Sequence, residues 1–274
     1  MKKILVAVNA SNLKTSLIDF SSYLARLTES PLTGLLIPAK QAGPLTHKQF
    51  AVENDNGHGH IVSSDWREEF PKSVSSFKEL CSNRGIHSET LSRLVISVDD
   101  LIRETRYADL LVVDAEISFR DELQAIPGAT LKKILSESEC PVIVAPENFD
   151  WVNQIIFAYD GNSSSVHAMK QFTYLFPEFK NREVMVLQVC EEKAGVITEK
   201  QKISAWLKTH YSGVSFRTLM GRPKDELFGY LLEKEKMIVV MGAFGRSMIS
   251  SLFSSSKAEL VLKSVNLPIF ICHK

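Results

Sequence analysis

Two glycines and a group of serines near the end of the chain have the spacing of a phosphate-binding loop. Gly242 and Gly245 follow an apolar strand predicted over 237–241, and the serines between 247 and 256 precede a helical stretch over 258–263. Glycines allow a sharp turn that exposes backbone N–H groups, and a helix N-terminus attracts anions through its unpaired N–H groups. The pattern therefore predicts a site for a phosphate-bearing ligand; the alternative is a tight turn without a ligand.

The composition is that of a globular protein without a polyanionic or membrane partner. The 274 residues carry 32 basic and 32 acidic side chains, and 45% are hydrophobic. This balance argues against a nucleic-acid or membrane-surface partner, and no apolar run approaches the roughly 20 residues that span a bilayer. The four cysteines show no C-x-x-C spacing, which favours a cytoplasmic protein with free thiols: Cys81, Cys140, Cys190 and Cys272.

The chain contains one strand pattern twice. The segment 155–160, an apolar run that ends in a polar residue, repeats 4–9 at a shift of 151 residues. Near the end of the chain, 268–271 repeats 141–144 at a shift of 127 residues. Two copies of a unit of this size predict two domains.

The two shifts locate an insertion and a domain boundary. Because 151 exceeds 127 by 24, the first copy carries 24 more residues than the second. The stretch 38–64, rich in turn-forming residues, is the predicted long loop that holds them. The predicted domains are 1–147 and 151–274. Each alternates strands and helices, which predicts an α/β domain with a mostly parallel five-stranded sheet and helices on both faces.

This architecture predicts where the polar strand ends lie. In parallel α/β sheets, ligands bind beyond the carboxyl ends of the strands. Asp160 closes the first strand of the second domain, and Gly242 closes the fourth. We therefore expect Asp160 to lie on the same sheet edge as the glycine loop.

On these residues the chain resembles the universal stress protein family in its tandem form. Tyr159-Asp160-Gly161-Asn162-Ser163 is similar to the strand-end Asp motif of the family, and Gly221-Arg222-Pro223 to its G-x-P turn. Gly242, Gly245 and the pair Ser255-Ser256 are similar to its ATP-binding signature G-2x-G-9x-G-S/T, with Ser255 in place of the third glycine.

The resemblance implies a Rossmann-like or flavodoxin-like fold, binding of ATP or a related adenine nucleotide, with or without Mg²⁺, and dimers paired through the fifth strands. Carried over to this sequence, Asp160 and Gly161 at the first turn would hold the adenosine portion. Gly242 and Gly245 would admit the phosphates and ribose close to the backbone, and Ser256 would hydrogen-bond phosphate.

Two further positions of the signature have two interpretations each. Ser255 is strained if the position needs a positive φ, but it is a good residue if the position caps the next helix. Arg246 follows Gly245 and either makes a charge-assisted phosphate contact or lies in solvent.

The first domain departs further from the pattern. Asn9 stands where Asp160 stands in the second copy. At the shift of 127, Ala115 and Ser118 replace the two glycines; a slip of one residue would put Asp114 and Ile117 there. Neither register supplies a glycine pair, so the N-terminal domain is predicted to keep the fold and to have lost the nucleotide site.

The sequence contains no catalytic constellation. It has no Gly-x-Ser-x-Gly elbow, no His-Glu-x-x-His and no Walker lysine. The prediction is a protein that is not an enzyme, with at most slow, incidental ATP hydrolysis. The histidines of 38–64 lack helical i, i+4 spacing, which favours a solvated loop over a metal site.

The remaining expectations concern partners. Strands predicted over 141–145 and 268–272 are short and apolar, and open apolar edges favour pairing. We expect them to pair within the chain as an intramolecular pseudo-dimer, with a homodimer and an unidentified protein partner left open. The expected function is a stress response regulated by a nucleotide bound to the C-terminal domain; the alternative is a nucleotide-free scaffold in which both sites are lost.

Overall fold

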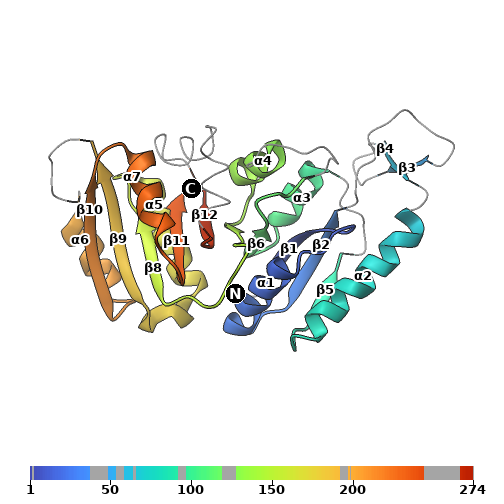
Figure 1. The fold of residues 1–274 in the computed structure, drawn as a ribbon, viewed down its shortest axis with the longest axis horizontal. Coiled ribbons are helices and arrows are strands. Elements are labelled where there is room, and N and C mark those ends of the chain that lie inside the picture. Colours follow the sequence, from blue (N-terminus) through green and yellow to red (C-terminus); the bar gives the residue numbers. More distant parts are fainter. Residues whose placement is uncertain are drawn as a thin grey trace.

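The structure consists of two α/β halves whose strands lie edge to edge (Figure 1). It is a computed structural model that describes residues 1, 3–37, 49–53, 59–63, 66–91, 97–118, 128–191, 197, 199–243 and 266–273. A small hairpin stands apart from the main sheet.

The N-terminal half has a parallel sheet in the order β5-β2-β1-β6-β7. Its helices follow strands, as the alternation in the sequence predicts. The elements of this half are β1 (Ile4–Asn9), α1 (Thr15–Thr28), β2 (Leu32–Ile37), β3 (Gln49–Glu53), β4 (Gly59–Ser63), α2 (Trp66–Ser82), β5 (Ser88–Thr90), α3 (Val98–Thr105), β6 (Leu110–Val113), α4 (Ala129–Glu137) and β7 (Val142–Val144).

The C-terminal half repeats this arrangement in the order β10-β9-β8-β11-β12, again with parallel neighbours. The predicted α/β fold class, with helices on both faces, is confirmed. The elements of this half are β8 (Gln154–Ala158), α5 (Ser163–Leu175), the 3₁₀ helix η1 (Pro177–Asn181), β9 (Glu183–Cys190), α6 (Lys200–Leu207), β10 (Gly213–Met220), α7 (Pro223–Leu232), β11 (Met237–Gly242) and β12 (Ile269–Cys272).

Strands β7 and β12 join the two halves. They pair antiparallel, with Ile143 opposite Phe270, so the described strands form one ten-stranded sheet. Because each half is parallel internally and the central pair is antiparallel, the carboxyl ends of the strands in one half lie at the opposite end of the sheet from those in the other. The two predicted ligand edges therefore lie at opposite ends of the sheet.

Part of the predicted loop over 38–64 is a β-hairpin. Strands β3 and β4 pair antiparallel, with Phe50 opposite Val62 and Val52 opposite His60. The prediction of continuous loop is wrong for these two five-residue strands. The turn-forming residues of this stretch predicted a loop, and backbone pairing between the two strands forms the hairpin.

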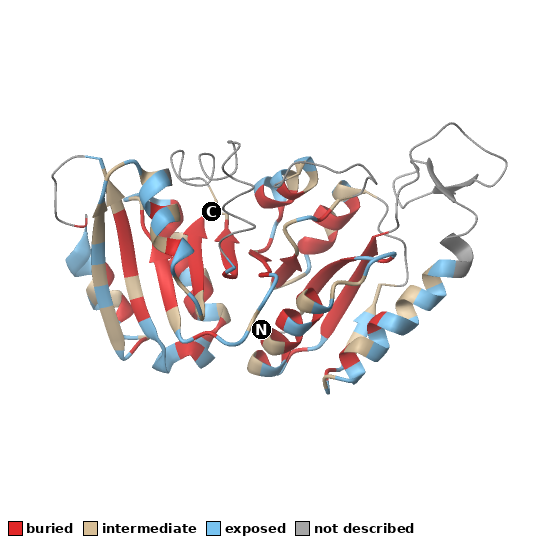
Figure 2. Cartoon of the chain, viewed as in Figure 1, coloured by how far each residue is buried: buried red, intermediate tan, exposed pale blue. Residues whose placement is uncertain are grey.

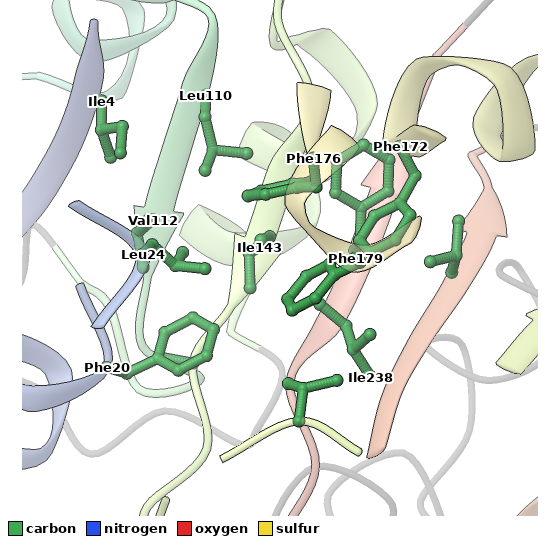
Figure 3. Close-up of a cluster of buried hydrophobic side chains, with 14 of the residues drawn as sticks. Ile4, Phe20, Leu24, Leu110, Val112, Ile143, Phe172, Phe176, Phe179 and Ile238 are labelled. Atoms are coloured by element: carbon green, nitrogen blue, oxygen red, sulfur yellow. The ribbon is translucent and has the colours of Figure 1, made fainter. Parts of the chain in front are cut away.

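The two faces of the sheet carry two cores that both extend across the β7–β12 pair. Helices α1 and α5 cover one face, where side chains from both halves belong to one cluster; α3, α4 and α7 cover the other. Figure 2 shows the buried residues concentrated in the strands and on the inner sides of the helices. Figure 3 shows part of the first cluster, with Ile4, Phe20 and Ile143 from one half and Phe172, Phe176 and Phe179 from the other. None of the helices in the described ranges has the length and apolar character that a membrane crossing requires.

The shared core predicts a large loss of stability when a side chain at the centre is truncated. Phe270 on β12 is fully buried and meets the Phe172 ring edge-on at a centroid distance of 5.2 Å. Phe270→Ala should lower the free energy of unfolding by about 3–5 kcal/mol, measured by urea denaturation. Tyr107→Ala, at a side chain that is 74% exposed, should change it by about 0.5 kcal/mol or less. Equal effects of the two substitutions would contradict the burial of Phe270 in the core.

Candidate functional site

The carboxyl ends of β8 and β11 meet at one edge of the C-terminal half. These strands are neighbours, with Phe157 opposite Val240. Asp160 and Gly161 follow β8, and Gly242 is the last residue of β11, so the structure brings these three predicted site residues to one edge. The other four, Gly245, Arg246, Ser255 and Ser256, lie outside the described residues.

Asp160 organises the turn between β8 and α5. Its Oδ1 accepts a hydrogen bond from the backbone N–H of Asn162 at 3.0 Å, and its Oδ2 accepts from Asn162 Nδ2 at 2.9 Å. Gly161 between them has φ +84°, a left-handed conformation that glycine adopts without strain. The turn leaves the carboxylate partly exposed at the strand end, where it can accept further hydrogen bonds.

Helix α5 begins directly after this turn and carries no acidic residue in its first turn. Its N-cap is Asn162, whose carbonyl oxygen accepts from Ser165 Oγ at 2.7 Å. The unpaired N–H groups and the dipole of a helix N-terminus favour negative charge nearby. A phosphate group would therefore find a favourable electrostatic environment beside the Asp160 turn.

Close packing explains why position 242 is a glycine, and the sequence alone did not reveal this packing. A Cβ atom at this position would lie 2.5 Å from the backbone carbon of Ser164, 2.6 Å from its oxygen and 2.8 Å from the nitrogen of Ser165. The first turn of α5 thus packs directly on the end of β11, and only glycine allows that approach. The glycine positions the helix N-terminus at the strand end, whether or not a ligand also needs the space.

Three buried side-chain oxygen atoms near this edge have no hydrogen-bond partner among the residues that the structure describes. They are Tyr159 Oη, Ser164 Oγ and Gln188 Oε1. Tyr159 follows β8, Gln188 lies near the carboxyl end of the neighbouring β9, and Ser164 lies in the first turn of α5. Burial also raises the pKa of Tyr159. A buried polar atom without a partner costs about 1–3 kcal/mol, so three of them at one edge point to a polar ligand or water there.

Sequence reasoning missed these three residues. Tyr159 and Gln188 are polar residues at the ends of apolar strands, which is a weak signal by itself. Ser164 is one of three consecutive serines, and only packing on Gly242 separates it from its neighbours.

The corresponding edge of the N-terminal half has the same turn after its first strand, but a different residue at the end of its fourth strand. Asn9 Oδ1 accepts from the backbone N–H of Ser11 at 3.0 Å, the same turn that Asp160 makes. Strand pairing sets Ile4 opposite Leu110, and Ile155 opposite Ile238.

Strand pairing decides which residue of the N-terminal half corresponds to Gly242, a question that the sequence left open between Ala115 and Asp114. Because Ile4 corresponds to Ile155, Leu110 corresponds to Ile238, and Asp114 takes the place of Gly242. The alignment of Ala115 with Gly242 is therefore wrong by one residue. That alignment superimposes identical valines of the two strands. Because side chains alternate between the two faces of a strand, equivalent residues must face the same core, and a slip of one residue places them on opposite faces.

Asp114 belongs to a charge cluster that is built into this edge. Lys14 Nζ lies 2.6 Å from Glu116 Oε2 and 3.4 Å from Asp114 Oδ1, and the Glu116 N–H donates to Asp114 Oδ1 at 2.6 Å. These three residues and Asn9 line a small cavity of about 90 Å³. Where the other half has Gly242, this edge has an ammonium group held between two carboxylates, at the N-terminus of α1.

Charge and burial oppose each other within the cluster. Burial raises the pKa of Asp114. Burial acts to lower the pKa of Lys14, but the negative charges of Asp114 and Glu116 outweigh it, and the pKa is raised. The cluster therefore retains its lysine charge at neutral pH and is unfavourable for a phosphate.

Comparison with known proteins identifies the fold. No family model matches the chain. A universal stress protein of Synechocystis sp. is 23% identical over 145 residues, which is 52% of this chain, and the chain spans only 50% of that curated relative. The crystal structure of a universal stress protein from Archaeoglobus fulgidus matches 99% of this chain and 98% of its own, with a TM-score of 0.66 at 14% identity. The chain has the tandem universal stress protein fold.

A second solved structure agrees with this assignment. A putative universal stress protein from Pseudomonas aeruginosa matches 99% of this chain and 92% of its own, with a TM-score of 0.57 at 14% identity. The resemblance to universal stress proteins predicted from the sequence is thus confirmed, and both matches extend over the two halves.

The packing of α5 on β11 can be tested with a pair of glycines. Gly242→Ala places a Cβ atom against the backbone of Ser164, so it should lower the free energy of unfolding by about 1–3 kcal/mol. Gly229→Ala, inside α7 with nothing within 4 Å of its Cβ position, should raise it by about 0.5–1 kcal/mol. Urea denaturation measures both, and a neutral Gly242→Ala would contradict the close approach.

The charge cluster predicts a pH-dependent effect of removing its lysine. Lys14→Met leaves Asp114 and Glu116 without a counter-charge, and should cost about 2 kcal/mol of unfolding free energy at pH 7.5. Because the folded-state pKa of Asp114 is already raised, lowering the pH protonates it in the folded state first, and the loss should shrink towards pH 5.

Lys133→Met is the matched control for this experiment. Lys133 Nζ pairs with Asp99 Oδ1 at 2.6 Å, but both side chains are exposed, so its removal should have little effect at either pH. A Lys14→Met loss that is independent of pH would show that Asp114 does not carry the effect.

Proposed function

We propose that the C-terminal half binds ATP or a related adenine nucleotide, with or without Mg²⁺, as a regulatory ligand in a stress response. The observation that supports this proposal is the position of the Asp160 carboxylate, which lies after β8 and beside the N-terminus of α5, next to the end of β11 that Gly242 closes. A hydrogen-bond acceptor for a nucleoside and a favourable place for phosphate lie at one edge.

The residues present fit such a ligand. Asp160 is partly exposed and can accept from ribose hydroxyl or base N–H groups. Tyr159, Ser164 and Gln188 contribute buried polar atoms at the same edge that have no partner within the described part of the chain. The proposed phosphate contacts of Gly245, Arg246, Ser255 and Ser256 fall outside the described residues and rest on the sequence signature.

The proposed role of the nucleotide is to shift a conformational equilibrium. The sequence offers no Walker lysine and no catalytic constellation. A ligand that binds one conformation better than another changes the surface that the protein offers to a partner. The N-terminal half, with Lys14 between Asp114 and Glu116, takes no nucleotide in this proposal.

The alternative is a nucleotide-free scaffold. One observation favours it: packing of α5 already accounts for the glycine at 242, so that residue does not by itself require a ligand. The two functions make opposite predictions for the same titration.

Isothermal titration calorimetry with ATP and Mg²⁺ tests the proposal. The wild-type protein should bind one ATP with a dissociation constant below 1 mM, which corresponds to about 4 kcal/mol. Asp160→Asn keeps an oxygen for the turn but removes the charge, and should weaken binding about tenfold. Absence of binding to the wild type below 1 mM would favour the scaffold.

Asn9→Asp is the matched control. Asn9 makes the same turn in the N-terminal half, so this substitution should leave ATP affinity unchanged. Equal losses in Asp160→Asn and Asn9→Asp would contradict a site in the C-terminal half.

A further inference from the structure

A second pocket lies at the opposite end of β11 from the Asp160 edge. Its volume is about 370 Å³, large enough for a small organic ligand. Its walls come from the segment that links the halves, from the turn between α7 and β11, and from the residues that lead into β12. The residues that carry the argument are Asn148, Asp150, Trp151, Leu232, Lys234 and Lys236; we call it the seam pocket.

Two large apolar side chains of the seam pocket are exposed. Trp151 is 46% exposed and Leu232 is 43% exposed. Phe149, between them and the N-terminal half, is anchored by ring contacts with Phe20 and Tyr23 at 4.9 and 4.7 Å. The wall that carries Trp151 is therefore held in place, while the indole itself remains accessible to a ligand.

Lys236 is held over the indole by an unusual backbone conformation. Its φ is 58°, in the left-handed region that residues other than glycine rarely adopt. Its carbonyl oxygen accepts from the N–H of Asn153 at 2.7 Å, which fixes the turn. Its Nζ lies 4.1 Å from the centre of the Trp151 ring.

Two lysines, Lys234 and Lys236, and two carboxylates, Asp150 and Glu235, line the pocket, and the position of Lys236 favours an anion over a cation. A cationic ligand would compete with Lys236, whose ammonium group already lies on the aromatic face where such a ligand would bind. An anion would gain from it, because the carboxylate of Asp150 lies 3.9 Å from Lys236 Nζ and is well exposed, and therefore holds the ammonium group weakly. Lys234 Nζ lies over the Tyr230 ring at 4.8 Å and adds a second positive charge.

We propose that the seam pocket binds a small planar aromatic anion, a carboxylate or sulfonate. Its ring packs against Leu232 and the exposed part of Trp151 that Lys236 does not cover, and its anionic group pairs with Lys236. The site is separate from the proposed nucleotide site, because Met237 at one end of β11 lines the pocket and Gly242 at the other end contacts α5.

Titration with 8-anilinonaphthalene-1-sulfonate, a fluorescent aromatic sulfonate, tests this proposal on the full chain. The wild type should bind one probe molecule with a rise in probe fluorescence. Trp151→Ala should weaken binding about tenfold, as loss of one stacking surface does. Lys236→Gly should weaken it about fivefold, and glycine suits the left-handed backbone, so this variant should be folded at least as stably as the wild type.

Two controls distinguish the seam pocket from other surfaces. Lys200→Ala removes a lysine that also lies over an aromatic ring, at 5.1 Å from the centre of Phe216, and should leave probe affinity unchanged. Asp160→Asn should also leave it unchanged, whatever its effect on ATP. Probe affinities of Trp151→Ala and Lys236→Gly within twofold of the wild type, in variants with wild-type thermal unfolding, would overturn the proposal.

Discussion

The antiparallel pairing of β7 with β12 is the constraint on which the rest of the structure depends. Three residue pairs, with Phe270 opposite Ile143 at the centre, turn two five-stranded sheets into one. Both strands are short and fully buried, so neither half could leave this edge open to water without exposing apolar side chains. The pairing merges the cores on both faces and sets the two ligand edges at opposite ends of the sheet.

The halves share a fold but differ in the chemistry of corresponding edges. In the C-terminal half, Gly242 lets the N-terminus of α5 approach β11. In the N-terminal half, Asp114 occupies that position and holds Lys14 from the start of α1. A residue without a side chain thus leaves a helix N-terminus at the strand end, whereas a carboxylate requires a cation beside it because burial of an unpaired charge is costly. The same backbone therefore presents one edge suited to an anion and one with its charges already paired.

Parts of the fold and of the candidate site could be predicted from the sequence, and other parts could not. The apolar runs at 4–8 and 155–158 were recognisable as buried parallel strands because both of their faces are covered. The polar residues that close them, Asn9 and Asp160, followed from the same pattern. The hairpin of β3 and β4 was missed because its strands are formed by pairing with each other rather than by a long periodic stretch. The register of β6 was left open because Val112 and Val113 match Val239 and Val240 at a shift of 127, whereas the strand pairing corresponds to a shift of 128.

The sequence by itself determined the α/β fold class, the internal repeat and the polar strand ends, since each of these depends on patterns that are read along the chain. Only the tertiary structure decided which distant residues meet. Lys14 contacts Asp114 across 100 positions, Gly242 contacts Ser164, and the linker forms a pocket with the start of β11. Local periodicity carries information about which face of an element is buried, but contacts between elements depend on how the strands order and pair, and no local pattern specifies that.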